Sequence, residues 1–272
     1  MTTIPIGGPA MPTVRAALRT AGLCAVLSMC PVDRAAAQLP TPASAPPATS
    51  VDPHARLLVG PVDPKVEAAA EGGDLHAQLE LALRYSVSFP GMGEDEPLAT
   101  YWYQRAAAQG DVGALMRLGS RAGGGLGMPR SPELSVAYYR RAGELGQPEA
   151  MYKVAMAYAA GRGVPADPAQ SLAWHLRAGA AKYPASVFLA GDACLQGVGT
   201  AVDERRALVL YLVGTRMMRD ALAASPGFTE KSLPADLKRG DAIARLHAEL
   251  GDSAYAEALA AAQAWHQGQP LP

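Results

Sequence analysis

The stretch that decides the fold runs from Ala150 to Ala178 and reads AMYKVAMAYAAGRGVPADPAQSLAWHLRA. Its first part carries Ala150, Val154 and Tyr158 at every fourth position, which places all three on one side of a helix. The glycines of Gly161–Gly163 end this helix because glycine adopts the positive φ values that a tight turn requires. Asp167-Pro168 then starts a second helix, with aspartate as the N-cap and proline at the first helical position.

This helix-turn-helix pattern returns along the chain with a period of 36 residues. Gly-x-Gly turns stand at 125–127, 161–163 and 197–199, and four other columns keep the same spacing. The columns are Trp102, Tyr138, Trp174 and Leu210; Ala106, Ala142, Ala178 and Gly214; Ala114, Ala150 and Ser186; Leu118, Val154 and Ala190. A fixed period in several independent columns indicates a tandem array, in which each repeat buries its apolar side against the next.

The pattern resembles the Sel-one-like repeat family, a branch of the tetratricopeptide-type αα-solenoids. The segments that carry the resemblance are Ala99–Ala107, Ala150–Tyr158, Gly161–Pro165 and Ser171–Ala178. We therefore expect an all-α, right-handed αα-solenoid of four helix-turn-helix repeats of about 36 residues. The fourth repeat departs most from the pattern, because Leu210 replaces the aromatic residue and Gly214 replaces the alanine.

We expect the repeat array to occupy residues 63–217. Its units are 73–109, 110–145, 146–181 and 182–217, and the first unit has its turn displaced to Gly91–Gly93. Beyond Met217 the period fades, and residues 218–272 are predicted to form C-terminal capping helices. The helices expected in this part of the chain are Arg205–Ala224, Ala235–Leu250 and Asp252–His266, with the last two separated at Gly251.

The N-terminal residues 1–37 have the features of a signal peptide. Arg15 and Arg19 precede an uncharged apolar run over 20–32, and Ala35–Ala37 provides small residues for cleavage after Ala37. This pattern predicts a periplasmic or secreted protein without stable membrane insertion after cleavage. The alternatives left open are a start at Met11 and a lipoprotein acylated at Cys30.

Residues 38–62 are rich in proline and alanine and are predicted to form a disordered linker, because proline donates no backbone hydrogen bond. The chain holds 24 basic and 25 acidic residues and has a formal net charge of −1. A nucleic-acid partner is therefore not expected, since binding to phosphates needs a dense basic surface.

The residues of the array that could carry chemistry are better explained by packing. Cys194 falls in the apolar column of Tyr85 and Tyr158, and His175 falls in a column that otherwise holds tyrosines. The run Glu94–Glu96 is expected to be a solvated helix N-terminus. No spacing typical of a zinc site or a phosphate-binding loop occurs, so no catalytic residue, cofactor or metal is predicted.

Basic residues recur on the first helix of successive repeats. We expect Arg84, Arg117, Arg121 and Lys153 to line a modest cationic ridge that binds a partner, although a solvated charged surface would give the same pattern.

The resemblance implies a non-catalytic scaffold or adaptor, which holds a protein or peptide partner in the cell envelope or secretory space. The alternative is a secreted enzyme of the β-lactam-binding or β-lactam-hydrolysing type. In some cysteine-rich secreted relatives of that type each repeat is stapled by a disulfide, whereas Cys194 is the one cysteine of this array, and no Ser-x-x-Lys occurs.

Overall fold

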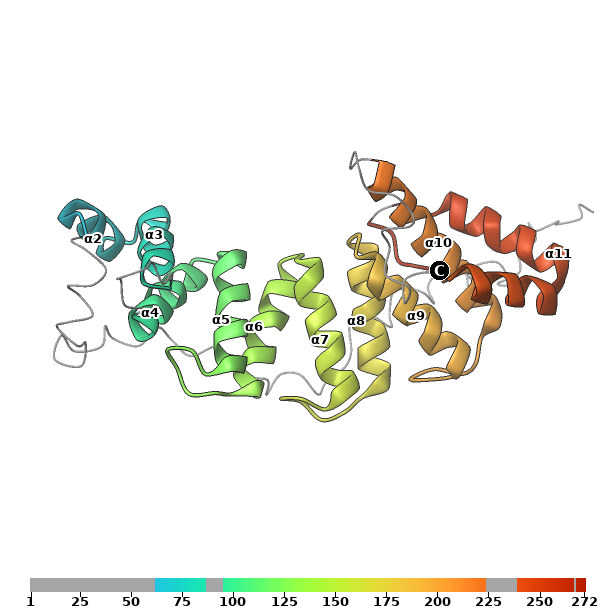
Figure 1. Cartoon of the computed structure of the whole chain (residues 1–272), viewed down its shortest axis with the longest axis horizontal. Coiled ribbons are helices and arrows are strands. Elements are labelled where there is room, and N and C mark those ends of the chain that lie inside the picture. Colours follow the sequence, from blue (N-terminus) through green and yellow to red (C-terminus); the bar gives the residue numbers. More distant parts are fainter. Residues whose placement is uncertain (1–61, 87–94, 224–238, 267) are drawn as a thin grey trace, which may run out of the picture. The chain divides into compact units, whose positions relative to one another are not determined.

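The computed structural model describes residues 62–86, 95–223, 239–266 and 268–272, and within these ranges the chain forms α-helices and no strand (Figure 1). The helices are α2 (Pro64–Glu71), α3 (Leu75–Ser86), α4 (Glu96–Ala108), α5 (Val112–Gly124), α6 (Pro132–Glu144), α7 (Pro148–Ala160), α8 (Pro168–Ala180), α9 (Pro184–Gln196), α10 (Glu204–Ala223) and α11 (Gly240–Ala264). The predicted signal peptide, the predicted linker up to residue 61 and the Gly91–Gly93 turn lie outside the described residues.

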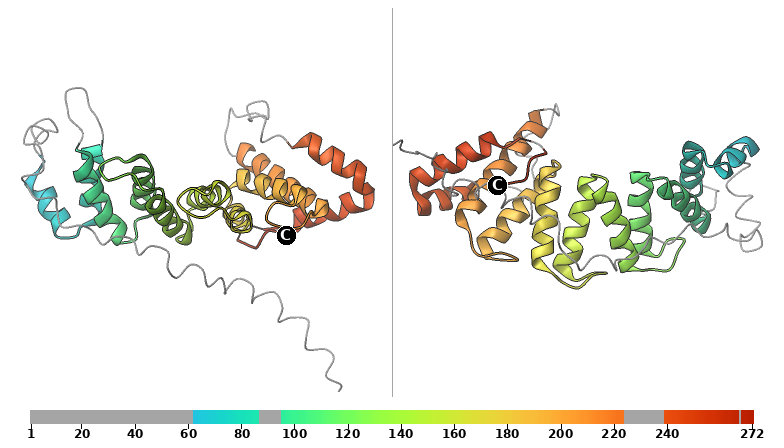
Figure 2. Two further views of the ribbon diagram at one scale, coloured as in Figure 1. Left: turned by 90° about the horizontal axis from the view of Figure 1, so that it is seen from below. Right: turned by 180° about the vertical axis from the view of Figure 1, so that it is seen from behind.

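Consecutive helices pack against one another in pairs. The pairs α3–α4, α5–α6, α7–α8 and α9–α10 form the four repeats, and α4–α5, α6–α7 and α8–α9 join each repeat to the next (Figure 2). At the two ends, α2 packs on α3 and α11 packs on α10. The prediction of an all-α array of four helix pairs is therefore confirmed.

Acidic or hydroxyl side chains fix the start of several helices. Asp95, Asp111, Ser131 and Asp167 each accept a hydrogen bond from a backbone N–H in the first turn of α4, α5, α6 and α8. The two first helices α7 and α9 have no side-chain cap of this kind.

The Gly-x-Gly turns end the first helix of a repeat and also contact the repeat before it. Gly161 closes α7 in the left-handed conformation, with φ of 63°. Two residues later, Gly163 has a φ of 73°, and a Cβ atom there would overlap the Pro132 carbonyl oxygen at the start of α6. Gly199 has the same relation to Pro168 at the start of α8. The second glycine of the turn thus lets each repeat pack closely against the repeat before it.

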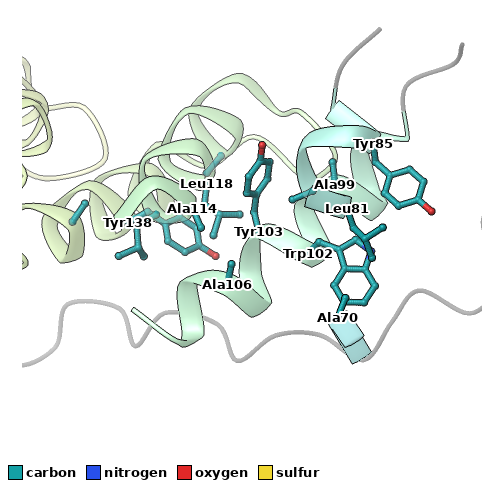
Figure 3. Packing of buried hydrophobic residues seen from close by; sticks show 14 of the residues in the cluster. Ala70, Leu81, Tyr85, Ala99, Trp102, Tyr103, Ala106, Ala114, Leu118 and Tyr138 are labelled. Atoms are coloured by element: carbon teal, nitrogen blue, oxygen red, sulfur yellow. The ribbon is translucent and has the colours of Figure 1, made fainter. Parts of the chain in front are cut away.

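The repeating aromatic residues lie in the core, as their spacing predicted. Trp102, Tyr138 and Trp174 are at most 5% exposed, and the alanines one turn further along each helix are fully buried. Figure 3 shows part of this packing, with Trp102 and Tyr138 among small side chains from α2 to α5. Small residues permit a close approach of neighbouring helices, and the rings fill the space beside them.

The helices beyond the array also follow the expected pattern. The backbone of α11 leaves the helical region at Gly251, where the sequence predicted a break between two helices. Leu246, Ala258 and Ala262 of α11 are buried in the same apolar cluster as Leu210 of α10. The expected start at Ala235 lies outside the described residues.

Replacing Gly163 by alanine is expected to lower the free energy of unfolding by about 3 kcal/mol or more, because the backbone of two repeats must separate. The matched control is Gly146→Ala, since Gly146 also has positive φ but has open space around its Cα. That variant should lose only about 1 kcal/mol, which is the cost of the left-handed conformation. Urea unfolding followed by circular dichroism measures both values. Equal losses would contradict the contact.

Candidate protein-interaction surface

The solvent side of the first helices carries large apolar side chains. We define the first-helix face as Leu79 and Leu83 on α3, Met116 and Arg117 on α5, and Tyr152, Lys153 and Met156 on α7. Leu83 is 53% exposed and Met156 is 39% exposed. Leu79 and Met116 are partly buried and pack against the core, so Leu83 and Met156 are the most exposed apolar side chains of this face. Large exposed apolar side chains are typical of binding surfaces when they gather.

Tyr139 of α6 contacts both α5 and α7. Its ring lies over Gly119 of α5, where an added Cβ would be 2.6 Å from the ring. The Nζ atom of Lys153 lies 5.6 Å from the centroid of the same ring. Burial raises the pKa of the Tyr139 hydroxyl, so the ring stays neutral beside the lysine. Met116, Arg117 and Lys153 therefore belong to neighbouring parts of one surface.

A second group of rings extends this surface toward α9. Tyr152 lies 5.1 Å from Tyr183 and 5.9 Å from His175, measured between ring centroids. Tyr183 directly precedes α9, at the place where α5 has the capping residue Asp111. Lys182, before it, has a φ of 67° where three earlier repeats have glycine. The fourth repeat thus lacks both the capping aspartate and the glycine at the position of positive φ. In their place it has the contact between Tyr152 and Tyr183.

Three of the four predicted ridge cations remain at or near the surface. Arg117 is exposed and makes no ion pair among the described residues. Lys153 is partly exposed, and its Nζ lies 3.3 Å from Glu149 Oε1. Arg84 is half-buried on α3. A surface pair such as Lys153–Glu149 contributes little to stability, so Lys153 can exchange it for a partner's carboxylate at small cost.

The placement of Arg121 in an exposed cationic ridge was wrong. Its side chain is 6% exposed and forms an ion pair with Glu96 of α4. It also donates hydrogen bonds to Thr100 Oγ1, at 2.9 Å, and to the Glu96 carbonyl oxygen, at 3.2 Å. Breaking a buried ion pair by removing one partner commonly costs about 3–5 kcal/mol. Arg121 therefore joins α5 to α4 and is not available to a partner.

The acidic run was correctly assigned to a helix N-terminus, but its described residues Asp95 and Glu96 are not fully solvated. Asp95 is 7% exposed and its Oδ1 accepts a hydrogen bond from Leu98 N at 3.0 Å. Glu96 makes the ion pair with Arg121. Glu94 lies outside the described residues.

The structure places a serine beside His175, which the sequence did not indicate. His175 Nδ1 lies 3.2 Å from Ser186 Oγ, where the residues come from α8 and α9. Ser186 is fully buried and His175 is 5% exposed, so a substrate cannot reach the hydroxyl in this conformation. Cys194 is also fully buried, and burial raises the pKa of its thiol, as expected for a core cysteine.

No group of three or more His, Cys, Asp or Glu side chains in the described part of the chain could hold a metal ion. No helix within the described ranges combines the length and apolar character needed to cross a membrane.

The first-helix face could have been found from the sequence. Leu79, Met116, Tyr152 and Phe188 recur with the repeat, as do the residues of the core columns. Only Phe188 of this column is buried. The signal was an apolar column beside the basic residues of the predicted ridge, since Met116 precedes Arg117 and Tyr152 precedes Lys153.

Lowering the pH from 6.5 to 4 is expected to destabilise the protein through His175. Burial lowers the pKa of His175 to about 4, whereas an unfolded histidine has a pKa near 6.5. Above pH 6.5 both states are neutral and the full stability is present. Below it, the unfolded chain binds the proton first, which removes up to about 3 kcal/mol by pH 4. Urea unfolding at several pH values should show a smaller decline for His175→Phe, and identical slopes would contradict this assignment.

Comparisons with known proteins agree with this architecture. The model of the Sel1 repeat matches residues 75–111, 112–147, 148–183 and 184–213. Among solved structures, the chain is similar to a protective antigen present in uropathogenic Escherichia coli strains that displays an SLR fold, with 28% identity and a TM-score of 0.50. That match covers 74% of this chain and 44% of the antigen, so the chain spans less than half of the antigen's length.

A Sel1 repeat protein from Oxalobacter formigenes is 23% identical, with a TM-score of 0.47, over 66% of this chain and 73% of that protein. Comparison with curated proteins gave no match. The four matched segments begin at the first residues of α3, α5, α7 and α9 and together cover about half of the sequence. The chain therefore belongs to the Sel1 repeat family.

Proposed function

We propose that this protein is a non-catalytic interaction scaffold of the cell envelope or secretory space, which holds a segment of a partner protein on its first-helix face. Sel1 repeat arrays are generally protein-interaction scaffolds. The observation that carries the proposal is the exposure of Leu83 and Met156 on a surface where Tyr139 connects successive helices.

The partner segment is expected to be apolar and acidic. Leu83, Met116, Tyr152 and Met156 offer apolar contact along the helices. Arg117 and Lys153 lie beside them and favour a carboxylate, and the exposed Arg117 has no ion pair within the described ranges. Complementary charges speed the encounter and set the register, while the apolar side chains supply most of the affinity.

We propose that the scaffold acts after export, on the basis of its N-terminal sequence. The basic residues Arg15 and Arg19, the apolar run over 20–32 and the small residues Ala35–Ala37 favour a cleaved signal peptide. The N-terminal sequence of the mature chain, isolated from fractionated cells, tests this part. A chain that starts at Gln38 in the periplasmic or secreted fraction is expected, and a cytoplasmic chain with its leader intact would contradict it.

The interaction is tested by a photo-crosslinking residue at position 116 in the exported full chain, followed by mass spectrometry of the captured protein. Purified partner is then titrated against variants. Met156→Asp should weaken binding at least tenfold, because it places a charge on the apolar part of the surface. Arg117→Glu with Lys153→Glu should slow association and weaken binding several-fold, with a smaller effect at high salt.

Val202→Asp is the matched control, because Val202 is 62% exposed and lies in the turn before α10, away from the first-helix face. It should bind the partner as the wild type does. Arg121 is left unchanged in these variants because its removal would destabilise α4 and α5. Equal affinity of the wild type and Met156→Asp, with both chains folded, would exclude the first-helix face as the binding surface.

A further inference from the structure

The last residues of the chain lie against the fourth repeat as a bound peptide would. We define the C-terminal segment as residues 265–266 and 268–272. Arg216 of α10 donates a hydrogen bond to the Trp265 carbonyl oxygen at 2.6 Å, and Arg206 Nε donates to the Pro272 main-chain oxygen at 3.1 Å. The backbone N–H of Gly268 donates to the Ala180 carbonyl oxygen at the end of α8, at 3.4 Å.

Two side chains of this segment are buried in the core, Trp265 directly after α11 and Leu271 near the end of the segment. Leu271 is 8% exposed and belongs to the apolar cluster formed by α8 to α11. A Cβ atom added to Gly179 of α8 would be 2.6 Å from Leu271 Cδ1 and 2.7 Å from Val187 Cγ2 of α9. The leucine therefore fills a pocket whose wall is made by a glycine.

The preceding repeat shows what normally fills this place. Gly143 stands 36 residues before Gly179, and a Cβ added there would be 3.2 Å from the ring of Trp174 and 3.2 Å from Met151. Val187 is the counterpart of Met151, and Leu210 is the counterpart of Trp174. Leu210 is smaller than tryptophan, and Leu271 lies against Gly179 as Trp174 lies against Gly143, so Leu271 takes the place of part of the indole.

We infer that this pocket between α8, α9 and α10 is a binding site for an extended, uncharged peptide segment of a partner protein, with a leucine or an aromatic residue next to proline. The C-terminal segment, which reads Gln269-Pro270-Leu271-Pro272, occupies the site within the same chain. This inference goes beyond the proposed function, because the pocket and the first-helix face have no residue in common.

The contacts explain why the occupant can be exchanged. Arg206 and Arg216 bind main-chain oxygens, which every extended peptide offers, so they do not select the sequence. Selection comes from the pocket, which takes one large apolar side chain. Trp174 cannot leave its pocket without unfolding α8, whereas Leu271 lies outside any helix. Because the C-terminal segment is tethered, its effective concentration at the pocket is roughly millimolar. A partner segment must therefore bind the pocket tightly enough to compete with it.

The experiment uses the full chain and a peptide with the sequence of residues 268–272, GQPLP. Amide chemical shifts of Gly179 and Val187 report binding by NMR. Leu271→Asp is expected to release the segment, since an ionised aspartate is disfavoured in an apolar pocket. The variant should then bind the peptide at least tenfold more tightly than the wild type does. A peptide with aspartate in place of its leucine should not bind.

Two other variants keep the test decisive. Leu271→Ala introduces no charge and is therefore expected to fold even if Leu271→Asp does not. It should bind the peptide several-fold more tightly than the wild type. Leu210→Trp, made in the Leu271→Ala chain, fills the pocket from α10 as Trp174 does in the previous repeat, and should abolish the gain in peptide binding while the chain remains folded.

The proposal is overturned if the folded Leu271 variants bind the peptide no better than the wild type, or if adding Leu210→Trp to Leu271→Ala leaves its peptide binding unchanged. It is also overturned if wild-type chains form a dimer in which each C-terminal segment crosslinks to Gly179 of the other copy. In that case the occupant is a second copy and not a partner protein. None of these outcomes depends on the first-helix face, so failure here leaves the proposed function intact.

Discussion

The array depends on the close contact between each Gly-x-Gly turn and the first turn of the second helix in the repeat before it. Gly163 meets Pro132 and Gly199 meets Pro168, in both cases backbone against backbone. Since side chains are excluded from this contact, the distance between successive repeats is set by the main chain and hardly changes with sequence. The aromatic and alanine columns can then recur at 36-residue spacing, because every interface between repeats has nearly the same volume to fill.

The fourth repeat shows how the same volume is filled when the usual residues are absent. Gly214 stands in the alanine column, and a Cβ added there would be 2.6 Å from the ring of Phe188. Leu210 is shorter than the aromatic residue that it replaces, and Leu271 supplies the missing apolar volume. Departures from the repeat pattern are thus compensated by residues that are distant in sequence, which couples the C-terminal segment to the end of the array.

Most of the fold could be predicted from the sequence because its determinants are local. The turn glycines, the caps and the apolar columns each act within about ten residues, so their spacing alone places the helices. The site was harder to predict. Whether a basic residue on a helix is exposed depends on the neighbouring helix, and Arg121 differs from Arg117 because Glu96 of α4 comes within reach of it. Leu271 could not be assigned either, since its partners Gly179 and Val187 come from far earlier in the chain.

The exposed apolar residues of the first helices have no such explanation within the fold. The aromatic and alanine columns of the first three repeats are buried without any contribution from these side chains. Leu83 and Met156 add apolar area to the solvent side of the array. Exposed apolar area favours unwanted association and does not stabilise the folded chain. A partner that covers these side chains gives them a role, and the neighbouring Arg117 and Lys153 would restrict which apolar segment can do so.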